Sequence, residues 1–292
     1  MSTWQTSILE LITRASTDLP TDVEQALQTA QDREEPGSNA QRALATMLEN
    51  TALARQNKQP LCQDTGTLLF WVDAPPRLTR TDIEKEVCAA VDTATERGLL
   101  RANCVDAVTG HNSGRNVGKG SPAIHWRESA RDTVRVALLL KGGGCENVSA
   151  QYALPDGDIN AQRDLDGVHR CCLDAVHRAQ GRGCAPGILG VCVGGDRESG
   201  YTESKRQLLR PLGQRSENRV LAGLEARILA DANKLGIGPM GFGGSTTLLD
   251  VFVSDLCRLP ASYFVTISYL CWSARRHIIE TDPDGRIHRW IS

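Results

Sequence analysis

One short stretch of the sequence gathers several reactive side chains. Residues 62–67 read CQDTGT, so a thiol, an amide, a carboxylate and a hydroxyl stand directly before an apolar run at 68–72. Pro60 breaks the preceding helical pattern, and Gly66 permits a backbone turn that is closed to most other residues. We therefore expect this stretch to form a loop that leads into a buried strand, a common place for functional side chains.

Three of the ten cysteines share this setting at the junction of a loop and an apolar strand. Cys62 precedes one such run, Cys184 precedes another and Cys271 follows a third. Because 122 residues separate the first pair (184 − 62) and 87 the second (271 − 184), only the fold could bring them together. Thiolates from separate loops can bind an iron–sulfur cluster, and three of them on four irons leave one iron free as a Lewis acid. The alternative is three unrelated buried thiols.

The cysteine spacing argues against three common uses of cysteine. The sequence contains no C-x-x-C pair, which argues against a structural zinc ribbon and against a thioredoxin-type site. A disulfide scaffold is not expected in a chain of 292 residues that has no recognisable export signal.

Two glycine-rich segments could bind anions or nucleotides. Residues 141–144 read KGGG, and consecutive glycines can direct several backbone N–H groups at one anion, with Lys141 and Asn147 as further donors. The alternative for this segment is a flexible surface turn. Gly236, Gly238 and Gly241 match the spacing of a dinucleotide fingerprint, but they follow a predicted helix instead of a strand.

Several basic side chains near these loops could bind a dicarboxylate, or could simply be solvated surface charges. Arg101 is of particular interest because it follows an apolar pair and precedes the polar segment at 103–106. The candidates are Arg101, Arg115, Lys119, Lys205, Arg275 and Arg276.

Composition is that of an ordinary globular protein, with 40% hydrophobic and 23% charged residues and a net charge of −2. The length allows a full core, in one large domain or in two lobes of one functional unit. A near-neutral charge selects neither nucleic acid nor an anionic membrane. The apolar run at 136–140 is far shorter than the roughly 20 residues that span a bilayer. We therefore expect a cytoplasmic protein without nucleic-acid or membrane partners.

Helical and strand patterns are interleaved irregularly, which predicts an α+β (mixed α/β) fold in which mixed sheets pack against helices. The N-terminal part to about residue 60 is largely helical. Predicted helices cover 3–15, 22–34, 40–51, 81–97, 160–180, 201–210 and 217–235. The helix at 81–97 is expected to begin with a capping box at Thr81 and Glu84. Predicted strands cover 68–72, 121–127, 133–140, 188–193, 246–253 and 262–270, with a closing hairpin around 282–285.

Four motifs in a fixed order give the sequence a resemblance to a known family. They are CQDTGT at 62–67, KGGGCEN at 141–147, LGIGP at 235–239 and CWSARR at 271–276. Together they resemble the class I fumarases and L(+)-tartrate dehydratases, over residues 46–276. The similarity is to the α subunit, or to the N-terminal region of the enzymes in which both halves are fused.

The resemblance implies a hydro-lyase that adds water to, or removes it from, a C4 dicarboxylate, either fumarate/malate or L-tartrate/oxaloacetate. It implies a [4Fe-4S] cluster held by Cys62, Cys184 and Cys271. Substrate contacts are implied at Gln63, Asp64, Arg101, Gly142, Cys145, Glu146 and Asn147. It further implies that residues 1–292 form a single α-type domain, and that a separate β subunit completes the active site in a hetero-oligomer.

Some residues depart from the family pattern. Cys184 is followed by Ala185 where the family commonly has proline, and Cys145 stands where many fumarases have serine. Residues 112–116 only approximate the family's Asn-Thr-Gly-x-Asn loop. Because such loops face the substrate in this family, the departures leave the choice of diacid open.

Asp64 has two possible roles, proton transfer at the departing oxygen or acceptance of hydrogen bonds from loop N–H groups. Two other classes of protein remain as alternatives to the hydro-lyase. One is a cluster-free, non-catalytic scaffold or binding subunit of the same fold, and the other is a nucleotide-dependent oxidoreductase that uses the loop at 236–241. Retention of all three candidate cysteines favours the enzyme.

Overall fold

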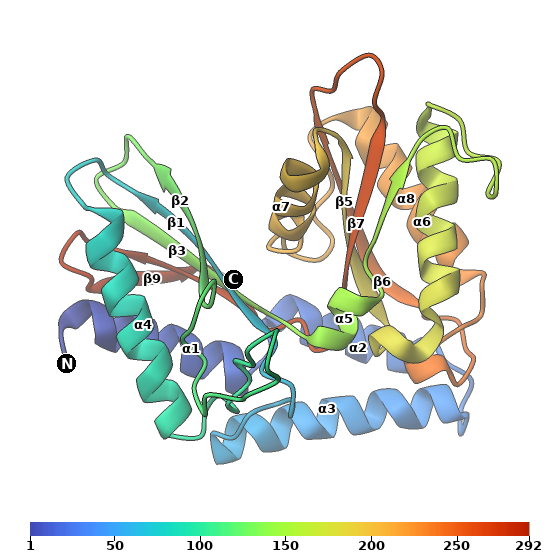
Figure 1. Ribbon diagram of the computed structural model, residues 1–292. Coiled ribbons are helices and arrows are strands. Elements are labelled where there is room, and N and C mark those ends of the chain that lie inside the picture. Colours follow the sequence, from blue (N-terminus) through green and yellow to red (C-terminus); the bar gives the residue numbers. More distant parts are fainter. Residues whose placement is uncertain (292) are drawn as a thin grey trace. The chain divides into compact units, whose positions relative to one another are not determined.

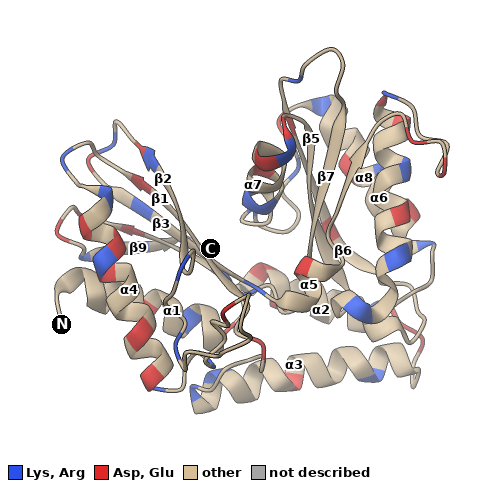
Figure 2. Ribbon diagram, in the orientation of Figure 1, with Lys and Arg blue, Asp and Glu red and all other residues tan. Residues whose placement is uncertain are grey.

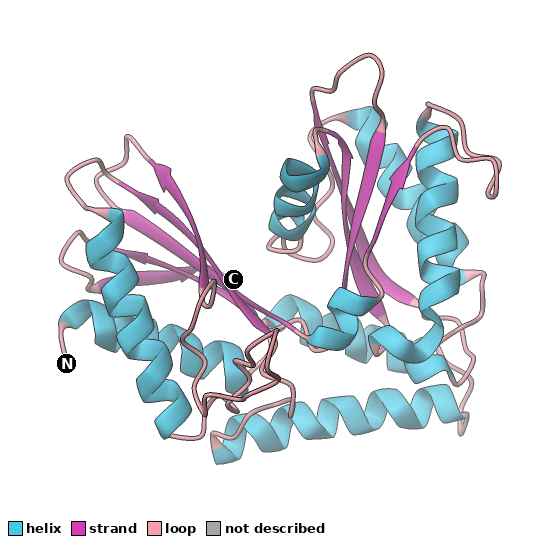
Figure 3. Cartoon of the chain, viewed as in Figure 1, coloured by secondary structure: helices cyan, strands magenta, loops and turns pink. Residues whose placement is uncertain are grey.

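A computed structural model describes residues 1–291, and it confirms the predicted α+β fold (Figure 3). The described chain forms two compact units. Unit 1 comprises Met1–Thr21, Glu49–Gly143 and Ser273–Ser292, and unit 2 comprises Asp22–Leu48 and Gly144–Trp272. Ser292 itself lies outside the described residues. That these units act as one functional domain remains a prediction.

Unit 1 is built on a five-stranded sheet with the order β2-β1-β3-β8-β9 (Figure 1). β1 runs parallel to β2, and the other neighbours in this sheet are antiparallel. The strands are β1 (Thr67–Ala74), β2 (Ala123–Glu128), β3 (Val134–Lys141), β8 (Arg276–Thr281) and β9 (Ile287–Ile291). β1 and β3 are almost wholly buried, which explains why both read as continuous apolar runs.

Two helices supply the apolar side chains that cover this sheet, α1 (Thr3–Thr17) and α4 (Arg80–Glu96). Their buried residues recur at helical spacing and pack with Phe70, Val72 and Leu138 in one core. The predicted cap of α4 is wrong by two residues. Thr79 is the N-cap, because its backbone is extended and its side chain accepts a hydrogen bond from the Asp82 N–H.

Unit 2 is built on a four-stranded sheet with the order β4-β7-β5-β6. Figure 1 shows α7 on one face of this sheet and α6 and α8 on the other. The strands are β4 (Ala150–Ala153), β5 (Gly187–Gly194), β6 (Leu248–Leu256) and β7 (Phe264–Leu270). The three helices are α6 (Leu165–Ala179), α7 (Arg197–Gln207) and α8 (Arg219–Asn233).

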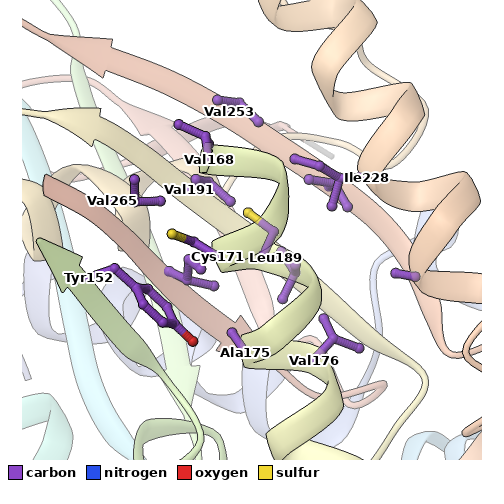
Figure 4. Packing of buried hydrophobic residues seen from close by; sticks show 14 of the residues in the cluster. Tyr152, Val168, Cys171, Ala175, Val176, Leu189, Val191, Ile228, Val253 and Val265 are labelled. Atoms are coloured by element: carbon purple, nitrogen blue, oxygen red, sulfur yellow. The ribbon is translucent and has the colours of Figure 1, made fainter. Parts of the chain in front are cut away.

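The core of unit 2 lies between this sheet and α6 and α8 (Figure 4). Cys171 and Ala175 of α6 face Leu189 and Val191 of β5, and Ile228 comes from α8. Cys172, the neighbour of Cys171, is also fully buried in this cluster. On the opposite face α7 approaches β5 closely, since a Cβ on Gly190 would lie 2.0 Å from the Ser204 carbonyl oxygen.

The remaining helices are α2 (Thr21–Arg33), α3 (Asn39–Asn57), α5 (Gly143–Asn147) and the short 3₁₀ turns η1 (Gln180–Gly183) and η2 (Pro239–Gly241). α3 is divided between the two units at Leu48 and Glu49. The sequence did not predict α5 or β4, because elements of four or five residues are too short to show a periodic pattern. The predicted closing hairpin is confirmed as the antiparallel pair of β8 and β9.

The glycine-rich loop at 236–247 binds a carboxylate of its own unit. Glu34 is only 4% exposed and accepts hydrogen bonds from the Ser245 N–H, the Ser245 hydroxyl and the Thr246 N–H. Gly244 has φ +117°, and a Cβ there would lie 2.7 Å from a Glu34 oxygen. The N–H groups of the fingerprint glycines also donate within unit 2, Gly236 to the Asn233 carbonyl, Gly238 to the Thr247 hydroxyl and Gly241 to the Gly238 carbonyl. Because these donors already have acceptors in unit 2, the structure argues against the nucleotide-dependent alternative.

Acidic and basic residues are interspersed along the exposed helices, as Figure 2 shows for α4. No helix within residues 1–291 has both the length and the apolar character needed to cross a membrane.

Candidate functional site

The loop that carries Cys62 and Asp64 is anchored at its start to two helices. The Leu61 N–H donates to the Ser16 carbonyl at the end of α1 (2.8 Å), and the Leu61 carbonyl accepts from the Asn50 side chain of α3 (2.9 Å). Leu61 is buried, whereas Cys62 is partly exposed and Gln63 is exposed. The predicted loop before a buried strand is therefore confirmed, and it presents the side chains of Cys62 and Gln63 at the surface of unit 1.

Asp64 is the acceptor that organises this loop. Its Oδ1 accepts from the Gly66 N–H (2.9 Å) and from the Asn103 side chain (3.3 Å). Its Oδ2 accepts from the Gly143 N–H (2.7 Å). Asp64 thus joins three segments of unit 1 that are far apart in the sequence. The loop-acceptor role proposed for it is present, and this geometry leaves its second proposed role, proton transfer, untested.

Gly66 is required by the closeness of β1 to the end of β3. It has φ +76°, and a Cβ there would lie 2.5 Å from the Lys141 carbonyl oxygen, a backbone atom that cannot move aside cheaply.

We expect Gly66→Ala to lower the free energy of unfolding by about 2–4 kcal/mol, because the cost of the strained backbone and the cost of the steric clash add together. Urea unfolding measures this. Gly98→Ala is the control, because Gly98 has φ +73° with no atom near its Cβ position. Equal losses in the two variants would show that the clash is unimportant.

The backbone of Arg101 is clamped by two side chains that the sequence did not single out. The Arg101 carbonyl accepts from the Thr65 hydroxyl (2.7 Å) and from the Asn116 amide (3.0 Å). Asn116 is 1% exposed, and it also donates to Thr95 and accepts from the Asn103 N–H. The exposed Arg101 side chain therefore projects from a fixed point. Thr65 belongs to the motif at 62–67 and Asn116 to the loop at 112–116, but nothing in the sequence indicates that the two side chains meet.

A pocket of about 290 Å³ opens beside Asp64 in unit 1. Most of its polar groups come from segments that the Asp64 and Asn116 hydrogen bonds hold together. Its lining includes Asp64, Asn103, Asn116, Lys119, Ser121 and Gly143. Concave sites with a few convergent polar groups are where small ligands commonly bind.

In unit 2 the structure brings Cys184 and Cys271 together. The Trp272 N–H, next to Cys271, donates to the Cys184 carbonyl (3.3 Å). Cys184 adopts a left-handed backbone (φ 55°, ψ 62°) at the end of η1 and is partly exposed, and Cys271 is 9% exposed. Two of the three predicted cluster ligands therefore share one small region of unit 2, and Cys62 belongs to unit 1.

Tyr269 lies beneath this pair of cysteines and was missed by the sequence analysis. A Cβ on Gly183 or Gly187 would come within 2.5 or 2.2 Å of its side chain, so the chain around Cys184 packs directly on the tyrosine. Burial raises the pKa of Tyr269 far above its ordinary value, and the nearby Cys145, Cys271 and Cys184 raise it further. The tyrosine remains neutral at physiological pH. It serves as a packing surface, which no sequence motif would have revealed.

The segment after β3 is a short helix, not an open nest of N–H groups. The Gly143 N–H already donates to Asp64. Cys145 is buried, with its thiol 3.9 Å from the Gly183 carbonyl, and Glu146 forms an ion pair with Lys205 (2.6 Å). Asn147 is exposed. In unit 2, Cys145, Glu146 and Asn147 therefore lie next to the turn that carries Cys184, whereas Gly142 belongs to unit 1.

The predicted ligands match an iron–sulfur cluster in their chemistry. Thiolates are the ordinary ligands of such clusters, and none of the three cysteines is in a disulfide. Within residues 1–291, however, no group of three or more His, Cys, Asp or Glu side chains is arranged to hold a metal ion. The observation in favour of the cluster is the adjacency in unit 2 of Cys184, which is partly exposed, and Cys271, which is buried.

The structure separates the basic candidates by their partners. Arg115 pairs with Asp92 on α4, and Lys205 pairs with Glu146. Arg275 and Arg276 are buried at the start of β8. Arg101 and Lys119 are exposed near Asp64. These two are the basic candidates best placed to meet a ligand from solution.

Comparison with known proteins decides the family. A sequence model of the family described as fumarate hydratase (fumerase) matches residues 5–280. The chain belongs to this family. The match confirms the predicted family.

Individual relatives show how the chain corresponds to members of the fumarate hydratase family. It is 45% identical over 289 residues to a protein of Geobacillus stearothermophilus named as a class I fumarate hydratase, covering 98% of this chain but 56% of that relative. It is 33% identical over 285 residues to a Methanocaldococcus jannaschii protein named as an L(+)-tartrate dehydratase subunit alpha, covering 96% and 98%. The alpha subunit of L(+)-tartrate dehydratase from Escherichia coli K12 is 30% identical over 271 residues, covering 92% and 88%. The chain thus spans little more than half of the class I relative but almost all of the M. jannaschii alpha subunit.

Proposed function

We propose that this chain is the α-type subunit of a [4Fe-4S]-dependent hydro-lyase that reversibly hydrates a C4 dicarboxylate, fumarate/malate or L-tartrate/oxaloacetate. The observation that carries the proposal is the family match over residues 5–280. Relatives named as alpha subunits are covered almost completely, which supports a separate β subunit in a hetero-oligomer.

We assign the cluster to Cys62, Cys184 and Cys271. When bound, such a cluster supplies an open iron that polarises the substrate hydroxyl and makes it a better leaving group. Support comes from the adjacency of Cys184 and Cys271 in unit 2 and from the partial exposure of Cys62 on its anchored loop. Cys145 is left out of the ligand set because its buried thiol contacts the Gly183 carbonyl.

The other residues of the proposed site bind and orient the diacid. The exposed guanidinium of Arg101 can form paired, charge-assisted hydrogen bonds with a carboxylate, and Gln63 offers both a donor and an acceptor. Asn147 and the Gly142 backbone complete the proposed binding groups. Asp64 is the candidate for proton transfer at the departing oxygen. Cys145 and Glu146 act by positioning, since one is buried and the other is paired with Lys205.

The test is anaerobic co-expression of this chain with the candidate β subunit. The complex should be brown, contain iron and sulfide, and turn over malate, fumarate or L-tartrate in coupled absorbance assays. Comparison of the three substrates would identify the diacid. Colourless, iron-free complex after anaerobic reconstitution would refute the cluster and favour the scaffold alternative. Iron-loaded complex that converts none of the three diacids would refute the reaction.

A further inference from the structure

Lys119 lines the pocket in unit 1 that Asp64 also lines. The pocket volume of about 290 Å³ suits a small polar molecule, and Asn103, Ser121 and Gly143 provide further polar groups. Lys119 and Asp64 are the charged side chains in this lining. What the pocket can bind therefore depends on whether these two charges neutralise each other.

The two charges do not pair. Both oxygens of Asp64 accept hydrogen bonds from other donors, namely the N–H groups of Gly66 and Gly143 and the Asn103 amide. Lys119 is exposed, and it forms no hydrogen bond or ion pair with any residue in the described range 1–291. An ammonium group in a pocket whose carboxylate is already engaged is available to an anionic ligand.

The backbone beneath Lys119 is fixed. Gly118 and Ser121 exchange two backbone hydrogen bonds of 2.9 and 3.0 Å across the turn, and Gly120 has φ +80°. The Ser121 hydroxyl donates to the carbonyl of the buried Asn116 (2.8 Å). The turn is thus attached to the same asparagine that clamps Arg101, so only the side chain of Lys119 has to be ordered when a ligand binds.

We propose that Lys119 binds one carboxylate of the diacid substrate, as a specificity-determining residue that supplements Arg101. This inference rests on the proposed function, and it deepens that function by naming a second cation for the dianion. A substrate with two carboxylates needs two positive groups, because a buried, unpaired carboxylate is costly. Both candidates come from segments that Asn116 holds in place.

The test compares Lys119→Met, Lys119→Arg and Lys85→Met in the anaerobically prepared complex with the β subunit. Lys85 is an exposed lysine of α4 and serves as the matched control. Loss of one charge-assisted contact predicts that Lys119→Met raises KM for the diacid by about tenfold. kcat should change much less, Lys119→Arg should restore most of the affinity, and Lys85→Met should match the unaltered complex.

A binding measurement separates this inference from the proposed reaction. Succinate, an unreactive C4 dicarboxylate, is titrated calorimetrically into the same complexes, and Lys119→Met should weaken its binding by about tenfold. If KM and succinate affinity are unchanged in Lys119→Met while the unaltered complex is active, the assignment of Lys119 is wrong. If the unaltered complex is inactive yet binds succinate through Lys119, the proposed reaction fails and the carboxylate site stands. Absence of succinate binding to the unaltered complex refutes the carboxylate site.

Discussion

Cys184→Ser is expected to remove the iron–sulfur cluster, whereas Cys172→Ser is expected to leave it intact. A serine hydroxyl does not replace a thiolate, because thiolates are the ordinary ligands of these clusters. Cys184 is partly exposed at the end of η1 and lies beside Cys271 through the contact of Trp272 with its carbonyl. Loss of this ligand should abolish turnover along with iron.

Cys172 is the matched control because its surroundings are the opposite. It is fully buried in α6 within the core of unit 2, and burial raises the pKa of its thiol, so it stays protonated and inert. A serine there can donate to the carbonyl one helical turn earlier, which limits the cost of a buried hydroxyl.

Iron and sulfide analysis of the anaerobic complex, together with its visible spectrum, measures this prediction. The melting temperature of each variant shows whether the fold has survived. Folded Cys184→Ser complex with the iron content of the Cys172→Ser complex would remove Cys184 from the ligand set.

Asp64→Asn is expected to lower kcat for the diacid by about 10²–10⁴-fold, the ordinary contribution of a positioned proton-transfer group. Asparagine keeps the shape of the side chain and one oxygen acceptor, but it cannot exchange a proton at physiological pH. Steady-state kinetics on the anaerobic complex measures the change, and iron content is determined on the same samples.

Asp106→Asn is the control for a purely structural effect. Asp106 also accepts hydrogen bonds within its own loop, from the Thr109 N–H, the Thr109 hydroxyl and the Val108 N–H, and these bonds lower the pKa of its carboxyl group. It organises a loop as Asp64 does, but it does not line the pocket. We expect Asp106→Asn to retain most activity.

Two results would contradict proton transfer by Asp64. Equal activity of the two variants would show that the carboxylate is needed only as an acceptor. Loss of iron together with turnover in Asp64→Asn would assign Asp64 to holding the loop that carries Cys62.

The sequence was sufficient for the fold class, most of the element order and the family. Long amphipathic helices such as α1 and fully buried strands such as β3 have strong local patterns, since one face of a helix, or both faces of a central strand, must be apolar. Short elements such as β4 were missed because four residues are too few to show a periodic pattern. The cap of α4 was misplaced because Thr79 and Thr81 both offer a capping hydroxyl.

The sequence alone also determined which side-chain types are available: three cysteines next to strands, the Asp64 carboxylate in a loop and several basic candidates. Their partners were decided only by the tertiary structure. In the structure, Asp64 accepts hydrogen bonds from the Gly66 and Gly143 N–H groups, and Glu146 forms an ion pair with Lys205. Glu34 accepts a hydrogen bond from the Thr246 N–H of the loop at 236–247. Lys119 was left exposed in the pocket. The physical reason is that a charge takes its role from the donor or acceptor nearest in space, and here those partners lie up to 212 residues away in the sequence.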